Sequence, residues 1–376
     1  MSDHLFSPIQ LGTLDLQNRI AVSPMCQYSA DDGCASEWHL QHWMNLAMSG
    51  AGMVTVEMTD VERRGRISHG CLGLYSEANA AAAKRALDAA RRVATPGTKF
   101  GIQLAHAGRK ASCQRPWEGG KPLSASEDAW TVVSASAVPY AEGHPVPQAL
   151  DEAGIAMLVE NFGRAAERAA RVGFDFIELH SAHGYLLHQF LSPLSNRRTD
   201  QWGGSLENRM RFPLAVARRV REAAPKLMLG ARLSVTDWVT GGFDVDDAIF
   251  GGQGLQTCRR KLHLLLERRQ LAIAKDTGWS RLSGASGDCH KEWRKHRHPR
   301  GGTDRSSGPG QRHHRFRESR HCGAGKSLSC RSTLGMAGGG TTRPCDCCTA
   351  ATAALRPVDQ TVGSGDVEHL GLLNHP

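Results

Sequence analysis

The first 250 residues alternate short apolar runs with stretches of helical periodicity, and this alternation limits the folds open to the chain. Residues 151–172, for example, repeat apolar side chains at helical spacing. The runs that have the length and composition of buried strands are residues 20–23, 53–57, 99–104, 174–179 and 227–233. Strands that are apolar on both faces are typical of a parallel sheet covered by helices. The pattern predicts an α/β fold, either a barrel or a doubly wound sheet.

Polar or reactive residues follow each predicted strand. The segments at the five strand ends read SPMCQY, EMTDV, QLAHAGRK, HSAHGY and ARLS. In a β/α barrel the carboxyl ends of the strands converge on one face, where ligands bind and catalytic groups lie. The sequence therefore favours a TIM (β/α)8 barrel, of which about five of the eight β/α units are recognisable.

Residues 251–376 have a different character. They contain 21 Lys and Arg against 10 Asp and Glu, whereas residues 1–250 contain 25 and 27, so the net positive charge of the chain comes from this part. Clusters of Arg, His, Cys and Gly follow no strand or helix period, and no sixth, seventh or eighth strand can be placed. We predict a barrel portion over residues 1–250 and an irregular basic tail over residues 251–376, either disordered or frame-shifted.

The expected cellular location depends on two sequence signals, a signal peptide and a membrane span. The start has no basic segment followed by an apolar stretch, and nowhere do eighteen apolar residues run together. We expect neither a signal peptide nor a membrane span, and a cytoplasmic location. In that compartment the eleven cysteines are expected to be reduced thiols rather than disulfides.

Several segments together closely resemble the Old Yellow Enzyme family of FMN-dependent ene-reductases, in its bacterial xenobiotic-reductase-like branch. They are NRIAVSPMCQYSADDG, GIQLAHAGRKAS, ELHSAHGYLLHQFLSPLSNRRTDQWGGSLENRMRFPLAV and ARLSVTDWVTGG, and the resemblance covers residues 1–250. It implies a (β/α)8 barrel that holds FMN. It also implies reduction of FMN by NADPH or NADH, and hydride transfer to the activated C=C bond of enones and related electrophilic alkenes. A homo-oligomer is compatible with it.

The resemblance assigns catalytic and substrate-binding roles. His180 and His183 would donate to the carbonyl oxygen of the substrate, where negative charge grows during hydride transfer. Tyr185 would protonate the opposite carbon, although solvent can also serve. Tyr28 would contact the substrate, and Cys26 would lie against both the flavin and the ligand.

The flavin contacts implied by the resemblance come from four strand ends. They are Ser23, Pro24, Met25, Cys26, Met58, Gln103 and Arg232. Gln103 would face the pyrimidine edge, and Arg232 would stabilise reduced flavin near its N1 and C2 carbonyl. The family has Glu-Ala where this chain has Glu57 and Met58, so a larger side chain enters at that contact. In the loop that follows the histidines, Ser205 is expected to be a helix N-cap with Asn208 in the first turn.

Simpler interpretations of the same residues exist. Taken singly, His180 and His183 resemble loop or core histidines, and Cys26 a small buried hydrophobic residue. A His-x-x-His pair can bind a metal, but no third ligand with zinc-like spacing is near, so no metal is expected. The joint match at four strand ends favours the enzyme. The alternative function is a non-enzymatic or relic protein whose basic tail binds nucleic acid, which we do not favour because aromatic residues for stacking are few.

A one-nucleotide frame slip near Phe250 explains the change of character. Back-translated with synonymous codons and read one base later, the segment after Phe250 can spell strings that contain SSGGNS and AVGLI. The segment from Cys322 can spell a string that contains LGRAF. These strings resemble the sixth, seventh and eighth strands of the family, in order. A chain without those strands is expected to fold poorly or to bind flavin weakly, since five strands cannot close a barrel.

Overall fold

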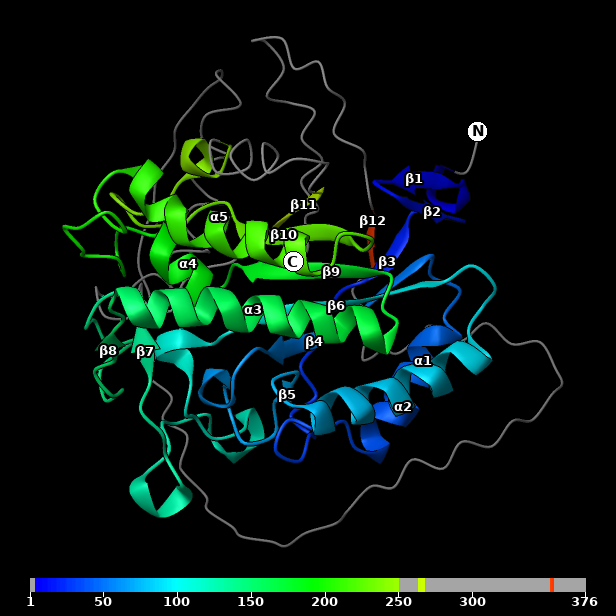
Figure 1. The fold of residues 1–376 in the computed structure, drawn as a ribbon, viewed down its shortest axis with the longest axis horizontal. Helices are drawn as coiled ribbons and strands as arrows, with labels where there is room; N and C mark the ends of the chain where they lie inside the picture. Colours follow the sequence, from blue (N-terminus) through cyan, green and yellow to red (C-terminus); the bar gives the residue numbers. More distant parts are fainter. Residues whose placement is uncertain (1–3, 250–262, 268–351, 355–376) are drawn as a thin grey trace, which may run out of the picture. The chain divides into compact units, whose positions relative to one another are not determined.

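A computed structural model of the protein describes residues 4–249, 263–267 and 352–354 (Figure 1). The chain begins with η1 (His4–Phe6) and an antiparallel hairpin of β1 (Ile9–Leu11) and β2 (Leu14–Leu16). The inward side chains of the hairpin form one apolar cluster with the first interior residues of the barrel strands, among them Met53, Phe176 and Met228. The hairpin therefore packs on the amino-terminal end of the sheet interior.

The main sheet is parallel along most of its width. Its order is β11-β10-β9-β6-β4-β3-β12, with the short strand β5 paired to β4 beside this path. The bounds are β3 (Ile20–Val22), β4 (Met53–Asp60), β5 (Leu72–Gly73), β6 (Lys99–Ala105), β9 (Phe176–Ser181), β10 (Met228–Ser234), β11 (His263–Glu267) and β12 (Thr352–Ala354). Each pair from β3 to β11 is parallel, whereas β12 runs antiparallel to β3. The first five predicted strands are confirmed, in chain order.

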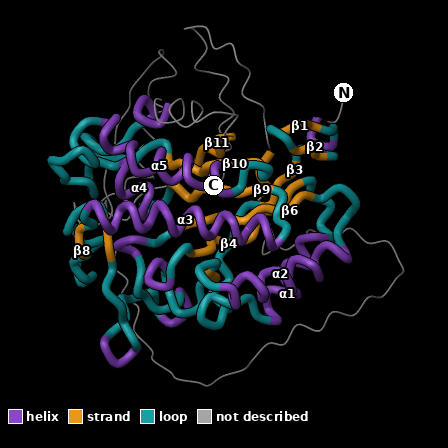
Figure 2. Tube along the Cα trace, viewed as in Figure 1, coloured by secondary structure: helices purple, strands orange, loops and turns teal. Residues whose placement is uncertain are grey.

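Helices cover the outer face of this sheet (Figures 1 and 2). They are α1 (Glu37–Ala47), α2 (Glu77–Val93), α3 (Glu152–Val172) and α5 (Leu206–Ala223), together with the short α4 (Leu186–Leu191) beside the end of β9. Outward residues of β6, such as Ile102 and Leu104, share one apolar core with Leu158 and Phe162 of α3. Burial of this helix stripe against the sheet is the main stabilising force.

The helix ends follow rules that the sequence displays. Asp151 accepts a hydrogen bond from Gly154 N at the start of α3, and Gly173 ends that helix with a left-handed φ of 102°. Ser205 accepts from Asn208 N and caps α5, as predicted. Such caps satisfy amide groups that a helix end otherwise leaves unpaired. Shorter elements connect the units: η2 (Arg63–Gly65), η3 (Gly108–Lys110), η4 (Pro116–Glu118), η5 (Ala125–Glu127), β7 (Val133–Ser134) and β8 (Gln148–Ala149).

Two strands lie in the part of the sequence where none could be placed. Strand β11 pairs in parallel with β10 and takes the position of a sixth barrel strand. Its sequence, HLLLE, has only three apolar residues between polar ones, which is too short for a pattern to reveal. Strand β12 is equally short. The rest of the predicted tail, and the prediction that it is disordered or frame-shifted, lie outside the described residues.

No helix in the described part of the chain is long and apolar enough to cross a membrane.

Candidate active site

The interior of the sheet is built in layers that rise toward the carboxyl ends of the strands. Side chains alternate along a strand, so Phe176, Glu178 and His180 of β9 face the same side at successive levels. Phe176 belongs to the apolar floor with the amino-terminal hairpin. Glu178 lies one level higher and is 1% exposed, and buried His180 lies at the mouth. Polar chemistry is thus confined to the upper two levels.

A β-bulge in β4 determines which side chain enters the site. The register against β6 shifts between Val56 and Met58, so Glu57 is the extra residue. Met58 lies opposite Gln103 and packs in one apolar cluster whose partly buried members include Cys26 and Tyr185. The predicted crowding of flavin by Met58 stays a prediction, but its side chain is next to two other predicted site residues.

The carboxylate of Glu57 contacts both the loop after β3 and helix α1. Its Oε2 accepts from Gln27 N at 3.0 Å, and its Oε1 lies 3.1 Å from Nε2 of His39 on α1. Burial raises the pKa of Glu57, and the hydrogen bond and charge of His39 oppose that shift. Glu57, the bulge residue, therefore fixes the position of the loop after β3.

Tyr28 is fixed in that first loop by contacts to its backbone and its ring. Its φ of 51° is uncommon for a residue other than glycine. Arg115 Nε donates to Tyr28 O at 3.1 Å, and the ring packs edge to face with Trp117 at 5.9 Å between centroids. Burial raises the pKa of Tyr28 above its ordinary value, so the phenol stays protonated at neutral pH. Trp117 itself is 66% exposed and lies at the rim.

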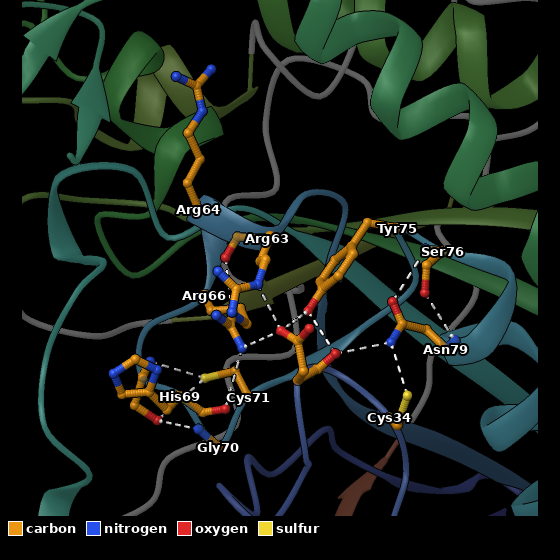
Figure 3. A network of polar contacts seen from close by, with 12 residues as sticks. Cys34, Arg63, Arg64, Arg66, His69, Gly70, Cys71, Tyr75, Ser76 and Asn79 are labelled. Atoms are coloured by element: carbon orange, nitrogen blue, oxygen red, sulfur yellow. Dashed lines mark hydrogen bonds and ion pairs between the residues drawn. The ribbon is translucent and has the colours of Figure 1, made fainter. Parts of the chain in front are cut away.

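A network around Asp32 joins the loops after β3 and β4. Figure 3 shows Arg63, Arg66, Tyr75 and Asn79 in one network of polar contacts. The Asp32 carboxylate accepts from Arg63 Nε at 2.8 Å and from Arg66 Nη1 at 3.1 Å. The Asp32 carbonyl accepts from Tyr75 OH at 2.9 Å and from Asn79 Nδ2 at 3.1 Å. Burial raises the pKa of Asp32, but the hydrogen bond from Arg63 and both positive charges outweigh it and lower that pKa.

The two predicted histidines contact each other in a defined order. Ala182 N donates to His180 Nδ1 at 3.3 Å, so the proton of the neutral ring is on Nε2. That Nε2 lies 3.2 Å from Nδ1 of His183. The proton of His183 is then on its own Nε2. Burial, followed by the charges of His183 and Arg232, lowers the pKa of His180 well below its ordinary value. His180 is thus a neutral ring whose Nε2 faces His183.

Tyr185 completes a cluster with the histidines. Its ring packs edge to face on His180 at 4.8 Å and lies 6.4 Å from His183. Lys110 Nζ is 4.8 Å from the centre of the Tyr185 ring and donates to His183 O at 2.9 Å. Burial raises the pKa of Tyr185 well above its ordinary value. The phenol therefore keeps its proton at neutral pH and can donate it.

The turn that carries these residues is strained and tightly held. His183 and Gly184 have φ values of 59° and 70°, and a left-handed histidine persists only where its surroundings fix it. Ser234 Oγ accepts from His183 N at 3.0 Å. His188 Nδ1 accepts from Gly184 N at 3.0 Å, and Gln189 Nε2 donates to Gly184 O at 2.7 Å. Groups from β10 and α4 thus position the turn.

Gln103 and Arg232, the two predicted flavin contacts on neighbouring strands, meet at Glu178. Gln103 Nε2 donates to Glu178 Oε1 at 2.6 Å, and Arg232 Nε donates to the same oxygen at 3.2 Å. Glu178 Oε2 is buried without a hydrogen-bond partner among the described residues. Because a buried carboxylate oxygen requires a donor, this atom fits a site completed by a bound molecule. An amide, a cation and a carboxylate on the barrel interior suit the polar edge of FMN.

Asp60, at the end of β4, is a further buried acid at this mouth. It pairs in register with Ala105, and neither carboxyl oxygen has a hydrogen-bond partner in the described part of the chain. Burial raises its pKa well above the ordinary value, opposed by the charge of Arg66. Burial likewise raises the pKa of Cys26, with Cys71 and Asp60 adding to the shift. Cys26 is therefore a thiol rather than a thiolate.

The structure brings most predicted residues together but not all. His180, His183 and Tyr185 form one cluster, and Cys26 and Met58 pack beside Tyr185. The remaining first-loop residues are less enclosed: Ser23 and Pro24 are half-buried, and Met25 is 39% exposed. Among the residues that the structure describes, no group of three or more potential ligands could hold a metal.

Sequence reasoning missed Lys110, Glu178 and Asp60. Each lies in or beside a segment that was recognised as polar, namely QLAHAGRK, the run before HSAHGY and EMTDV. Glu178 was detectable as a charge within an otherwise apolar strand, because such a residue is buried only with a partner. Lys110 and Asp60 carried no comparable signal, since a polar residue just beyond a strand is usually exposed.

Comparisons with known proteins identify the family of the chain. Residues 4–277 match the model of the NADH:flavin oxidoreductase / NADH oxidase family. The chain is 43% identical over 242 residues to an NADH:flavin oxidoreductase of Gibberella zeae, a match that covers 63% of this chain but 58% of that protein. It is 42% identical over 247 residues to an NADPH dehydrogenase of Listeria innocua, covering 65% of this chain and 68% of the relative.

Solved structures show the same fold. Morphinone reductase matches with a TM-score of 0.59 and 31% identity, covering 69% of this chain and 71% of that one. The same enzyme in complex with tetrahydroNAD matches with a TM-score of 0.58 and 31% identity, covering 70% and 74%. These proteins are barrels of the Old Yellow Enzyme type, and FMN and a nicotinamide are the cofactors of such oxidoreductases. The chain belongs to the NADH:flavin oxidoreductase / NADH oxidase family.

Proposed function

We propose that the chain is an FMN-dependent oxidoreductase that uses NADPH or NADH to reduce the activated C=C bond of enones and related electrophilic alkenes. The observation that carries the proposal is the cluster of His180, His183 and Tyr185 one level above the Gln103–Glu178–Arg232 group. A set of hydrogen-bond donors therefore adjoins a set suited to the flavin edge. Small-molecule alkenes are the substrates that this order of layers fits.

The chain's own residues supply binding, orientation and a proton. When bound, FMN supplies the hydride chemistry between the nicotinamide and the alkene. The His180–His183 pair holds the substrate carbonyl oxygen and stabilises the negative charge that develops on it. The His180 ring is neutral in this role, because burial keeps its pKa low. Protonation of the ring is therefore not needed for this role.

Tyr185 holds the proton that the other alkene carbon requires. Its pKa is raised by burial, so it stays protonated at neutral pH. A raised pKa also makes it a weak acid, and the Lys110 ammonium over its ring favours the phenolate that forms on donation. Tyr28, whose ring packs edge to face with Trp117, would contact the substrate.

The test measures NADPH oxidation coupled to loss of 2-cyclohexenone, with FMN in excess. The double variant His180→Ala/His183→Ala is expected to lose at least ~100-fold in kcat/KM, since removal of one positioned donor costs about 10²–10³ in such sites. Glu160→Gln, on the exposed face of α3, is the control. An unchanged rate and unchanged ligand affinity in the double variant would contradict the proposal.

The other expectations from sequence stand as proposals on sequence grounds alone. We retain a cytoplasmic location and a homo-oligomer compatible with the family. Nucleic-acid binding by residues 251–376 stays the alternative function, and most of that segment lies outside the described residues.

A further inference from the structure

Glu178 joins the two residues that are expected to contact the flavin edge. It lies on β9 between β6 and β10, in register with Gln103 on one side and Gly230 on the other. Since Gly230 has no side chain, the guanidinium of Arg232 can extend down to the Glu178 carboxylate. Oε1 of Glu178 accepts from Gln103 Nε2 at 2.6 Å and from Arg232 Nε at 3.2 Å. Glu178 is 1% exposed and Gln103 is 2% exposed, and the Arg232 side chain is 12% exposed, so bulk water has little access to the three groups.

The carboxylate determines which way the Gln103 amide points. A side-chain amide has a donor end and an acceptor end that can exchange by rotation. An ionised carboxylate only accepts hydrogen bonds, so it requires the NH2 end of Gln103 to face Glu178. The Gln103 oxygen must then face away from Glu178. Gln103 is presented to a ligand as an acceptor, suited to an imide N–H.

The same carboxylate compensates the charge of Arg232. Glu178 and Arg232 form a buried pair, and the low dielectric of the interior strengthens their interaction. The electrostatic effect of the Arg232 guanidinium on a bound flavin is therefore partly neutralised by Glu178. Removal of the carboxylate charge would make the local charge near the ring more positive.

We propose that Glu178 is a positioning residue that fixes Gln103 as the acceptor for the imide N–H of the flavin and limits the electrostatic effect of Arg232 on flavin reduction. This inference rests on the proposed function, because it requires that the barrel bind a flavin. Glu178 acts through its two neighbours rather than on the reacting atoms. A merely structural role would instead affect all flavins equally.

The experiment compares two probes, lumiflavin and N3-methyllumiflavin, which lack the ribityl phosphate. Their affinities are measured by fluorescence titration with the full chain, with Glu178→Gln and with the control Glu62→Gln. Glu62 is also a partly buried acid with a histidine and an arginine partner, on the loop after β4. The wild-type chain is expected to bind lumiflavin roughly 10-fold or more tightly than the N3-methyl probe, since a buried acceptor left unpaired costs about 1–3 kcal/mol.

In Glu178→Gln the discrimination between the probes is expected to fall to about 3-fold or less, because the Gln103 amide can now rotate. The midpoint potential of bound lumiflavin is expected to shift in the positive direction, because loss of the Glu178 negative charge favours reduced, anionic flavin. Glu62→Gln should change neither quantity. A second variant, Glu178→Asp, keeps the charge but shortens the reach, so it should lower the discrimination and leave the potential nearly unchanged.

The possible outcomes distinguish the role of Glu178 from flavin binding by the barrel. Unchanged discrimination in both Glu178 variants, or equal weakening of both probes without a shift in potential, would overturn the role of Glu178 alone. A negative shift in Glu178→Gln would overturn the electrostatic part. If the wild-type chain binds neither probe, flavin binding itself is refuted, and the role of Glu178 with it.

Discussion

At the scale of single residues, the burial of Asp60 is expected to make the free energy of unfolding depend on pH. Neither of its carboxyl oxygens has a hydrogen-bond partner in the described part of the chain, and burial raises its pKa well above the ordinary value. The folded state therefore binds a proton that the unfolded state releases above about pH 4. The stability that Asp60 contributes is present below that pH and is lost as pH rises through its folded pKa.

Asp60→Asn is expected to remove this pH dependence. The free energy of unfolding of the variant should fall less between pH 5 and pH 8 than that of the parent chain, because the amide does not ionise. Urea unfolding at several pH values measures the difference. Asp88→Asn, which removes an exposed carboxyl on α2, reports the general effect of losing a charge. A parent and an Asp60→Asn variant with parallel pH curves would show that Asp60 is not a buried acid.

His180 gives a second prediction at this scale. Its pKa is lowered by burial and by the nearby charges of His183 and Arg232. We expect the His180 ring to stay neutral down to pH 6, observed as an NMR signal of its ring protons that does not titrate between pH 6 and 8. A group with a lowered folded pKa contributes stability that is lost at acid pH, because the unfolded chain gains the proton. A titration midpoint near 6.5 would contradict the proposed neutral His180 ring.

At the scale of elements, the close approach of β6 to β9 depends on a glycine. A Cβ at Gly101 would overlap the ring of Phe176 in the floor of the barrel interior. Gly101→Ala is expected to destabilise the protein by about 1–3 kcal/mol, the usual cost of overpacking a core. In Gly163→Ala on α3 the atoms nearest the added Cβ belong to the far end of the long Arg219 side chain, and the helix gains propensity. Equal unfolding midpoints for the two variants in urea would refute the packing argument.

The loop after β10 is joined to α4 through Asp237. Its Oδ2 accepts from Ser192 Oγ at 2.5 Å and from Phe243 N at 2.8 Å. Nε2 of His188 lies 3.1 Å from Oδ1, although without the alignment of a hydrogen bond. Burial raises the pKa of Asp237, but His188 and Ser192 outweigh it and lower that pKa.

Asp237→Ala is expected to cost about 3–5 kcal/mol of unfolding free energy, because it leaves several buried donors without an acceptor. The loss should be measured by thermal and urea unfolding at pH 7. Asp244→Ala, on the same loop but exposed, is the matched control. The parent should also lose this stabilisation as the pH falls through the lowered pKa of Asp237. A cost below about 1 kcal/mol would mean that the loop does not depend on this carboxylate.

At the scale of the whole molecule, the main feature is the extent of the barrel sheet. The described sheet runs from β11 to β12, and β12 is antiparallel to its neighbour β3, unlike the strands of a parallel barrel. In barrels of this type the loops after the seventh and eighth strands bind phosphate. The strings recovered in the shifted frame after Phe250 resemble those strands.

Restoration of the frame after Phe250 is expected to yield a protein that retains about one FMN per chain through purification. The chain as given is expected to retain a smaller fraction, because it lacks the sequence of the phosphate-binding loops. Absorbance of the purified proteins near 450 nm measures the difference. Stoichiometric flavin in the unrepaired chain would refute the prediction that it binds flavin weakly, whereas sequencing the gene around the codon for Phe250 tests the frame slip itself.

The sequence by itself determined the β/α order, the helix caps at Asp151 and Ser205, and the residues gathered at the strand ends. These features depend on local periodicity and on side chains close in sequence, so they are readable from the chain. Only the tertiary structure decided that a bulge turns Glu57 away and Met58 inward, and that Gln103 and Arg232 share Glu178. It also decided that the carboxyl of Asp60 is buried without a partner in the described residues. Such facts depend on register and burial between strands far apart in sequence, where a shift of one residue exchanges the two faces of a strand.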